Sequence, residues 1–154
     1  MAERQLMAAA LSLAVMCSAC DSPTSPDWSP AQPEVAIGTV VFTAVARRGD
    51  GDRLTISLLA GNEGPDTVSV EILGGPCLMI ARVFSDPEHR HVKWQSKKAD
   101  EECVIPAHLI SLRPKEVAVI ERTWEYRITA RSYVTAEFRH SRAYHLDAGR
   151  VDPR

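Results

Sequence analysis

The sequence has little of several features that mark large classes of protein. It has 154 residues, only 6% aromatic side chains and a formal net charge of −2. Nucleic-acid-binding proteins are usually basic, so this charge balance gives no reason to expect a nucleic-acid partner. The length fits one domain and excludes a large multidomain enzyme. The 45% of hydrophobic residues are nevertheless sufficient for a packed core.

Motifs for the common catalytic chemistries are also missing. The sequence contains no Gly-x-Gly-x-x-Gly, no P-loop and no Gly-x-Ser-x-Gly nucleophile motif. A catalytic triad needs a nucleophile, a base and an orienting acid, and no spacing here predicts such a set. We therefore expect a protein that is not an enzyme and that uses no cofactor.

The longest apolar run lies at the N-terminus and is too short to cross a membrane. Residues 6–16 are almost all small or apolar, whereas a spanning helix needs about 20 apolar residues. Such a run followed by small residues is typical of a secretory signal peptide, which we predict over residues 1–19. Ser18-Ala19-Cys20 resembles the end of the lipobox of bacterial lipoproteins. That resemblance implies a lipid on Cys20 and a bacterial envelope membrane, facing the periplasm or the exterior, with plain secretion as the alternative.

Residues 20–34 follow the predicted cleavage site and contain four prolines. A segment so rich in proline, serine and aspartate cannot form a core, and it is typical of an extended, disordered tether. Trp28 is its one large apolar residue. Two interpretations of Trp28 stay open, namely contact with the bilayer interface and docking on the folded domain.

Two cysteines remain beyond the leader, Cys77 and Cys103. In an oxidising compartment we expect them to form a disulfide, and a loop of this length is worth about 3 kcal/mol. Two unpaired buried thiols and a two-cysteine metal site are the alternatives.

From Val35 onward the hydrophobic pattern has a period of two, which predicts strands. Turn residues interrupt it every 8–12 positions, and the last clear strand is Ser132–His140. Residues 77–84 are apolar throughout and predict a strand buried on both faces. The pattern predicts an antiparallel β-sandwich of about seven to nine strands over residues 35–146, with a C-terminal tail at 147–154.

Polar and aromatic residues between Arg53 and Arg139, among them Asn62, Trp94 and Glu116, fall in a characteristic order. That order resembles the Ig-like domain of the intracellular proteinase inhibitor (BsuPI) family. Lys115 stands where that family tends to have glycine. The resemblance implies an Ig-like fold and raises inhibition of a proteinase as a function. Tyr133 is either a tyrosine corner or an ordinary strand aromatic. The positions that carry the match are Asn62, Trp94, Pro114, Glu116, Trp124 and Tyr133.

Three polar residues are candidates for a site. His89 and His91 would share one face of a strand and are weak candidates for metal ligands, although we expect no metal. Arg82 interrupts an apolar segment, so it either faces solvent or pairs with a carboxylate such as Glu121 or Glu137, because an unpaired buried arginine is too costly.

The absence of catalytic motifs, together with the leader and tether, favours a lipid-anchored envelope protein with a non-catalytic Ig-like binding domain. Its partners would be the membrane, through the lipid on Cys20, and a protein of the envelope, possibly a protease. The alternative function is a proteinase inhibitor that acts through a loop near 74–77 or 97–103.

Overall fold

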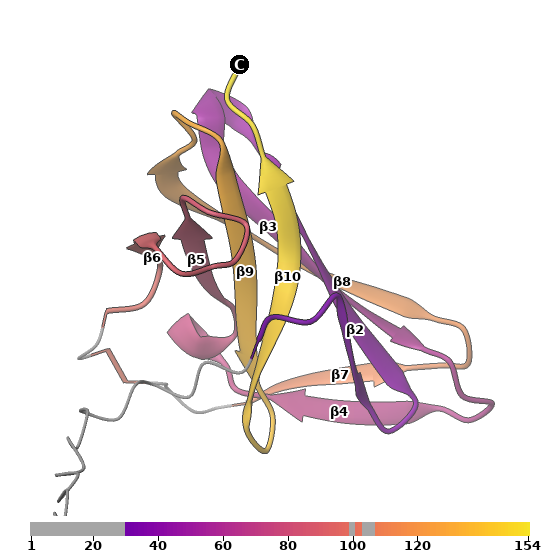
Figure 1. Cartoon of the computed structure of the whole chain (residues 1–154). Coiled ribbons are helices and arrows are strands. Elements are labelled where there is room, and N and C mark those ends of the chain that lie inside the picture. The colour runs from indigo at the N-terminus through magenta and orange to yellow at the C-terminus, as the bar shows by residue number, and fades with distance from the viewer. Residues whose placement is uncertain (1–29, 99–100, 103–106) are drawn as a thin grey trace, which may run out of the picture.

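A computed structural model describes residues 30–98, 101–102 and 107–154 (Figure 1). These residues form ten strands and two short 3₁₀ turns. In chain order they are β1 (Glu34–Ile37), β2 (Val40–Arg48), η1 (Asp50–Asp52), β3 (Arg53–Asn62), β4 (Val68–Ile72), η2 (Gly75–Cys77), β5 (Ile80–Phe84), β6 (Val92–Gln95), β7 (His108–Leu112), β8 (Val117–Arg127), β9 (Ser132–Arg139) and β10 (Ala143–Val151).

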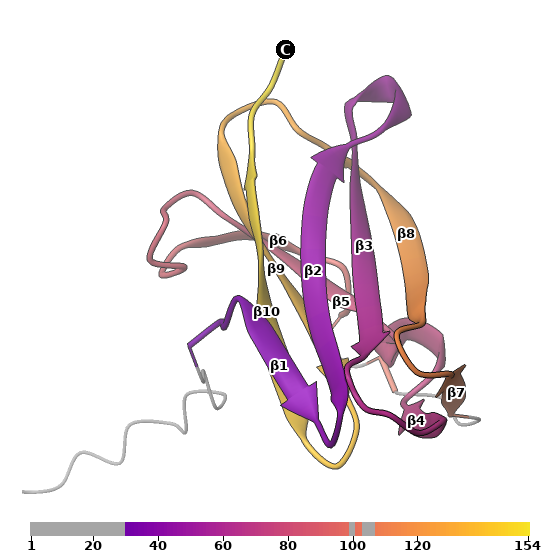
Figure 2. The same cartoon turned by 90° about the vertical axis from the view of Figure 1, so that its right-hand side faces the viewer.

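The strands form three antiparallel sheets. One sheet has the order β1-β2-β3-β8 and is called the β3 sheet below. The second has the order β10-β9-β5-β6 and is called the β9 sheet, while β4 and β7 form a two-stranded third sheet. Figure 2 shows the β3 sheet and the β9 sheet facing each other, with β1 and β2 beside β10. The predicted all-β antiparallel sandwich is confirmed.

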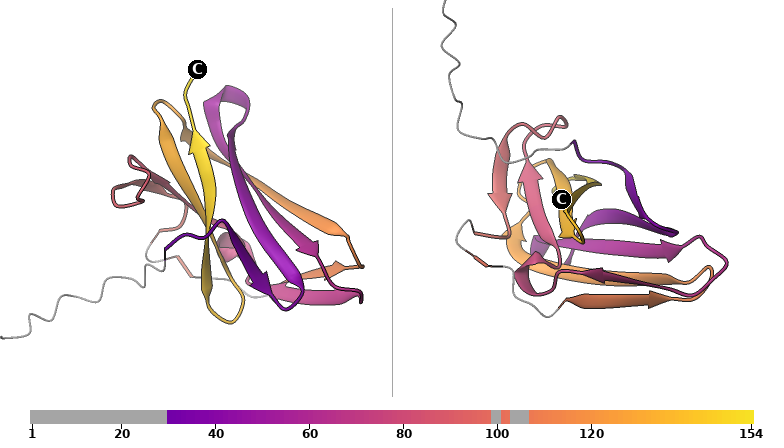
Figure 3. Two further views of the ribbon diagram at one scale, coloured as in Figure 1. Left: turned by 45° about the vertical axis from the view of Figure 1, so that its right-hand side comes forward. Right: turned by 90° about the horizontal axis from the view of Figure 1, so that it is seen from below.

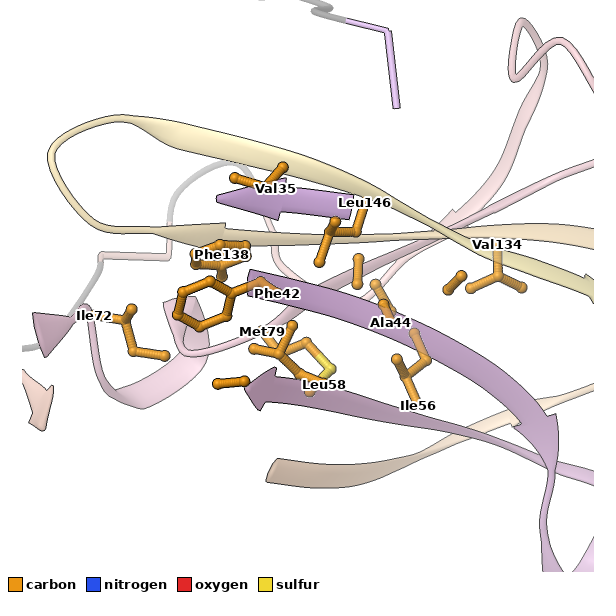
Figure 4. Packing of buried hydrophobic residues seen from close by; sticks show 14 of the residues in the cluster. Val35, Phe42, Ala44, Ile56, Leu58, Ile72, Met79, Val134, Phe138 and Leu146 are labelled. Atoms are coloured by element: carbon orange, nitrogen blue, oxygen red, sulfur yellow. The ribbon is translucent and has the colours of Figure 1, made fainter. Parts of the chain in front are cut away.

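Alternating apolar residues from both sheets form the core. Phe42 of β2 and Phe138 of β9 stack with ring centroids 4.6 Å apart, and this contact joins the two sheets (Figure 4). Leu54, Ile56 and Leu58 of β3 are almost completely buried, and the residues between them point to the other face. Because neighbouring residues of a strand point to opposite faces, the period of two in the sequence becomes one core face per sheet.

The third sheet lies across one end of the β3 sheet, as Figure 3 shows. Ile72 of β4 and Ile110 and Leu112 of β7 are buried there. Asn62, at the end of β3, holds this end together and is itself buried. Its side chain donates to the carbonyls of Asp66 and Leu112, and its Oδ1 accepts from the backbone N–H of Gly64.

The turn from β2 to β3 falls where the sequence predicts it, between residues 48 and 53. Gly51 has φ of +65°, a conformation that glycine adopts without strain. Gly49 has an ordinary φ of −92°, but a Cβ there would lie 2.6 Å from Oγ1 of Thr55. One glycine is therefore required by its backbone angle and the other by a close approach.

The apolar segment 77–84 is shorter as a strand than predicted. Cys77 ends the turn η2, where Pro76 and the φ of +61° at Gly75 interrupt the extended chain. The strand β5 begins only at Ile80. Its residues are buried on both faces apart from the half-buried Arg82, as predicted for a strand paired on both sides.

The last strand, β10, was not predicted, and it runs past the expected domain end at residue 146 to Val151. A β-bulge between Asp147 and Gly149 explains why the pattern hides it. Leu146 and Ala148 face the core two residues apart, but the next core residue is Val151. The bulge adds one residue and so breaks the alternation that predicts a strand.

Candidate functional site

The two large sheets differ in how their outer faces are covered. On the β9 sheet, four residues that point away from the core are still buried. Phe84 and Ile80 of β5 and Thr135 and Glu137 of β9 are at most 4% exposed. On the β3 sheet, the corresponding face is open to solvent, and Val45, Val117 and Val119 are more than half exposed. Each face is a candidate site of a different kind.

A buried carboxylate lies on the outer face of the β9 sheet. Glu137 Oε2 is 2.7 Å from Arg82 Nη2, and Glu137 Oε1 is 3.0 Å from Nε of Arg139. The Nε of Arg82 also donates to Gln95 at 2.8 Å. The sequence indicates Glu121 and Glu137 as possible partners of Arg82, and the pairing with Glu137 is confirmed. Glu121 instead lies on the other sheet, 2.9 Å from Arg47.

The two arginines keep Glu137 ionised. Burial by itself raises the pKa of this carboxyl. The charge and hydrogen bond of Arg82 act in the opposite direction, as does the hydrogen bond from Arg139. Together they lower the pKa below its ordinary value of 4.5. His145 of β10 lies nearby, with Nδ1 3.8 Å from Glu137 Oε2. A buried ion pair of this kind is costly to break, because removing one partner leaves an uncompensated charge.

A cavity of about 510 Å³ opens above this network. Phe84, Thr135 and His145 of the β9 sheet line it from below. Residues 88–90, in the loop between β5 and β6, line a second side, and the chain just before β1 lines a third through Pro30 and Ala31. The cavity therefore brings together three segments that are far apart in the sequence.

The loop between β5 and β6 is held in shape by Asp86. Its carboxylate accepts backbone N–H groups from Arg90 at 3.0 Å and from His91 at 2.8 Å, and it also contacts Nδ1 of His91 at 3.0 Å. These bonds lower the pKa of Asp86 to about 2, and the bond from the Arg90 backbone has the largest effect. His89 has a positive φ of +56° and packs against Phe84, with ring centroids 4.8 Å apart.

The loop geometry separates the two candidate histidines. His89 contacts the floor of the cavity, whereas His91 is bound to Asp86, because residues 89–91 are a turn and not a strand. Among the residues that the structure describes, no group of three or more histidine, cysteine, aspartate or glutamate side chains could hold a metal ion.

The positions that resemble the inhibitor family stabilise the fold at three places. Asn62 joins β3 to the third sheet, as described above. Glu116 accepts the backbone N–H of Arg113 at 2.7 Å in the turn that contains Pro114. Lys115 in the same turn has φ of +62°, a left-handed conformation that glycine adopts without strain.

Trp94 and Trp124 close one side of the sandwich. Trp94 of β6 stacks on Tyr126 of β8 at 4.9 Å and meets Trp124 edge-on at 6.4 Å. These contacts join the last strand of the β9 sheet to the last strand of the β3 sheet. Tyr133 is half-buried in β9 and pairs with Phe84 across the sheet.

The open face of the β3 sheet carries a contiguous apolar patch. Val117 and Val119 of β8 pair with Gly61 and Leu59 of β3, and Gly61 in turn pairs with Val41 of β2. We call Val41, Leu59, Val117 and Val119 the valine patch. Farther along β8, Glu121 and Glu125 form exposed ion pairs with arginines of β2 and β3. No described strand pairs with the far side of β8, so among the described residues β8 is an edge strand of the β3 sheet.

Several predicted sites lie outside the described residues. These are the leader, the lipidation site Cys20 and the second disulfide cysteine, Cys103. Cys77 is fully buried beside β9. No helix in the described part of the chain is long and apolar enough to cross a membrane.

Comparisons with known proteins add no relative. No family model, no curated protein and no solved structure matches this chain.

The sequence pointed to part of the charged network but not to the cavity. Because Arg82 interrupts an apolar segment, the sequence indicated either a solvent-facing arginine or a carboxylate partner, and Glu137 was one of the two partners named. Nothing in the sequence indicates that His145, which lies in a strand that was not predicted, is close to Glu137. The cavity depends on how a loop and the segment before β1 fold over the sheet, and no local pattern encodes that arrangement.

Proposed function

We propose that this protein is a lipid-anchored, non-catalytic binding protein of the bacterial cell envelope. The signal peptide pattern, Cys20 and the proline-rich tether support the anchor. The folded domain already includes the last residues of the predicted tether, because Gln32 is hydrogen-bonded to β10 and β1 begins at Glu34. This arrangement presents a single β-sandwich at a membrane surface.

The observation that carries the binding role is the valine patch beside the free edge of β8. Val117 and Val119 are 55% and 59% exposed, and they lie at the edge of a sheet whose outer strand is 11 residues long. A free edge presents unpaired N–H and C=O groups, which are a template for another strand. Contiguous exposed apolar residues commonly mark protein interaction sites.

The chemistry of the partner follows from these two features. An extended segment of an envelope protein adds to β8 as a further strand, and its backbone pairs with the free edge. Its alternate side chains are apolar where they meet the valine patch. Polar side chains suit the positions beyond the patch, where Glu121 and Glu125 are already paired with arginines.

A pair of matched variants tests this surface in the membrane-bound, full-length protein. A photoreactive group placed at Thr123 crosslinks the partner, which is then identified by mass spectrometry. We expect Val119→Lys to abolish this crosslink. Val92→Lys is the control, because Val92 is similarly exposed (46%) but lies on β6 of the other sheet. Equal crosslinking by both variants would contradict a binding site at β8.

The anchor is tested separately by the intact mass of the protein isolated from membranes. We expect a mature chain that begins at Cys20 and carries lipid, and a Cys20→Ser variant that is released from the membrane. The same spectra under non-reducing and reducing conditions test the Cys77–Cys103 bridge, which would lower the mass by two hydrogens.

Inhibition of a proteinase is the second function that the sequence raises. The segment 74–77 gives it little support, because it forms a 3₁₀ turn whose Gly75 carbonyl accepts from Arg122, with Cys77 buried. The other loop, 97–103, lies partly outside the described residues. Titration of the full chain against a panel of serine proteases decides this alternative, since an inhibitor reduces activity near a one-to-one ratio.

A further inference from the structure

The cavity on the β9 sheet lies directly beside the point where the described chain begins. Pro30 and Ala31 form one of its walls. Two backbone hydrogen bonds fix the next residue, Gln32, to β10. The Gln32 N–H donates to the carbonyl of His145 at 2.9 Å, and the Gln32 carbonyl accepts from the N–H of Asp147 at 2.8 Å. Gln32 also forms an isolated parallel bridge with Leu146 of β10 before the chain enters β1.

The fixed position of Gln32 limits where the preceding residues can lie. Consecutive Cα atoms are 3.8 Å apart, and an extended chain spans at most about 3.6 Å per residue. Trp28 is two residues before Pro30 in the sequence, so its Cα lies within about 7 Å of the Pro30 Cα. The large indole side chain is therefore within reach of the cavity without any further change in the domain.

The cavity lining suits an aromatic side chain with an acidic neighbour. Phe84 and His89 present two rings in contact with each other, and aromatic rings pack favourably at their edges or offset faces. Arg90, on the rim, offers a guanidinium that can lie over an indole. The residue before Trp28 is Asp27, whose charge is opposite to that of Arg90.

We propose that the cavity is the docking site of the chain's own tether, with the indole of Trp28 as its occupant. A tethered side chain has an effective concentration in the millimolar range for a short flexible connection, whereas a separate ligand loses translational freedom on binding. Docking shortens the free part of the tether to the residues between Cys20 and Asp27. It also turns the outer face of the β9 sheet towards the anchor.

The emission of Trp28 tests this proposal in the full-length protein reconstituted in lipid nanodiscs. The difference between the parent and a Trp28→Phe variant isolates its fluorescence from that of Trp94 and Trp124. We expect blue-shifted emission that is protected both from acrylamide in the water and from brominated lipids in the bilayer. Strong quenching by acrylamide would mean a solvent-exposed tether, and strong quenching by brominated lipids would place the indole in the membrane. Either result overturns the proposal.

A variant of the cavity wall then locates the docked indole. His89→Gly removes one ring at a position whose positive φ favours glycine, so the loop keeps its conformation. We expect Trp28 to become several-fold more accessible to acrylamide in this variant. His91→Ala is the matched control, because His91 lies in the same loop but does not line the cavity. Equal accessibility in both variants would exclude this cavity as the site, and neither measurement depends on a partner binding at β8.

Discussion

The two outer faces of the sandwich use the same kinds of residue in opposite ways. Each carries arginine–carboxylate pairs, yet the side chains of Arg82 and Glu137 on the β9 sheet are 13% and 2% exposed, whereas those of Arg47 and Glu121 on the β3 sheet are about half exposed. The covered face is therefore committed to the fold of the domain. The open face costs little to change, which leaves it free to serve recognition.

The largest expected difference between the faces concerns apolar side chains. We expect Phe84→Ala to lower the free energy of unfolding by about 3–5 kcal/mol, because it removes a fully buried ring from the covered face. Val119→Ala on the open face should change it by no more than about 0.5 kcal/mol. Urea unfolding measures both. Similar losses would show that the two faces are equally integral to the fold.

The charged pairs should differ in the same direction. Arg82→Met leaves Glu137 with Arg139 and His145 alone and should cost about 3 kcal/mol in unfolding free energy. Arg47→Met removes an exposed partner of Glu121, and we expect a loss below about 1 kcal/mol. The same urea experiment tests the pair. An Arg82 variant as stable as the Arg47 variant would contradict a buried, uncompensated charge.

Acid should affect the covered face through Glu137. Its pKa is lowered in the folded protein, so its contribution to stability is present above the ordinary value of 4.5 and is lost as the pH falls through the lower folded value. We expect Glu137→Gln to flatten the decline in unfolding free energy below pH 4.5. Urea unfolding of the parent protein and of the Glu137→Gln variant at a series of pH values measures this decline. The same decline in both proteins would assign the acid sensitivity to other carboxyls, such as Asp86.

The smallest expected effect lies outside both faces, in the turn that leads into β8. Lys115→Gly relieves a left-handed backbone conformation and should raise the unfolding free energy by about 0.5–1 kcal/mol. Thermal unfolding would record it as a small rise in Tm. Lys115→Ala is the control, since alanine removes the side chain but keeps the strain.

How far the sequence predicts this molecule depends on whether a feature is local. The alternation along β2, β3 and β8 predicts the sandwich, because each strand has one core face. For Arg82, in an apolar segment, the sequence leaves two outcomes, exposure to solvent or a carboxylate partner, and the structure shows the second, with Glu137. β10 escapes prediction, since the bulge near Gly149 shifts the alternation, and the cavity escapes because it is made by tertiary packing of distant segments.

The attachment of Gln32 to β10 has a mechanical consequence. Tension that reaches Gln32 from the N-terminal side of the chain is transmitted to β10 before it reaches β1. Gln32 forms an isolated parallel bridge with Leu146, so its two backbone hydrogen bonds point to the middle of β10 rather than to a frayed end. A pull along the strand loads both bonds together, in shear. Among the described residues, the first part of the fold to resist such a pull is thus its last strand, which spreads the load over the β9 sheet.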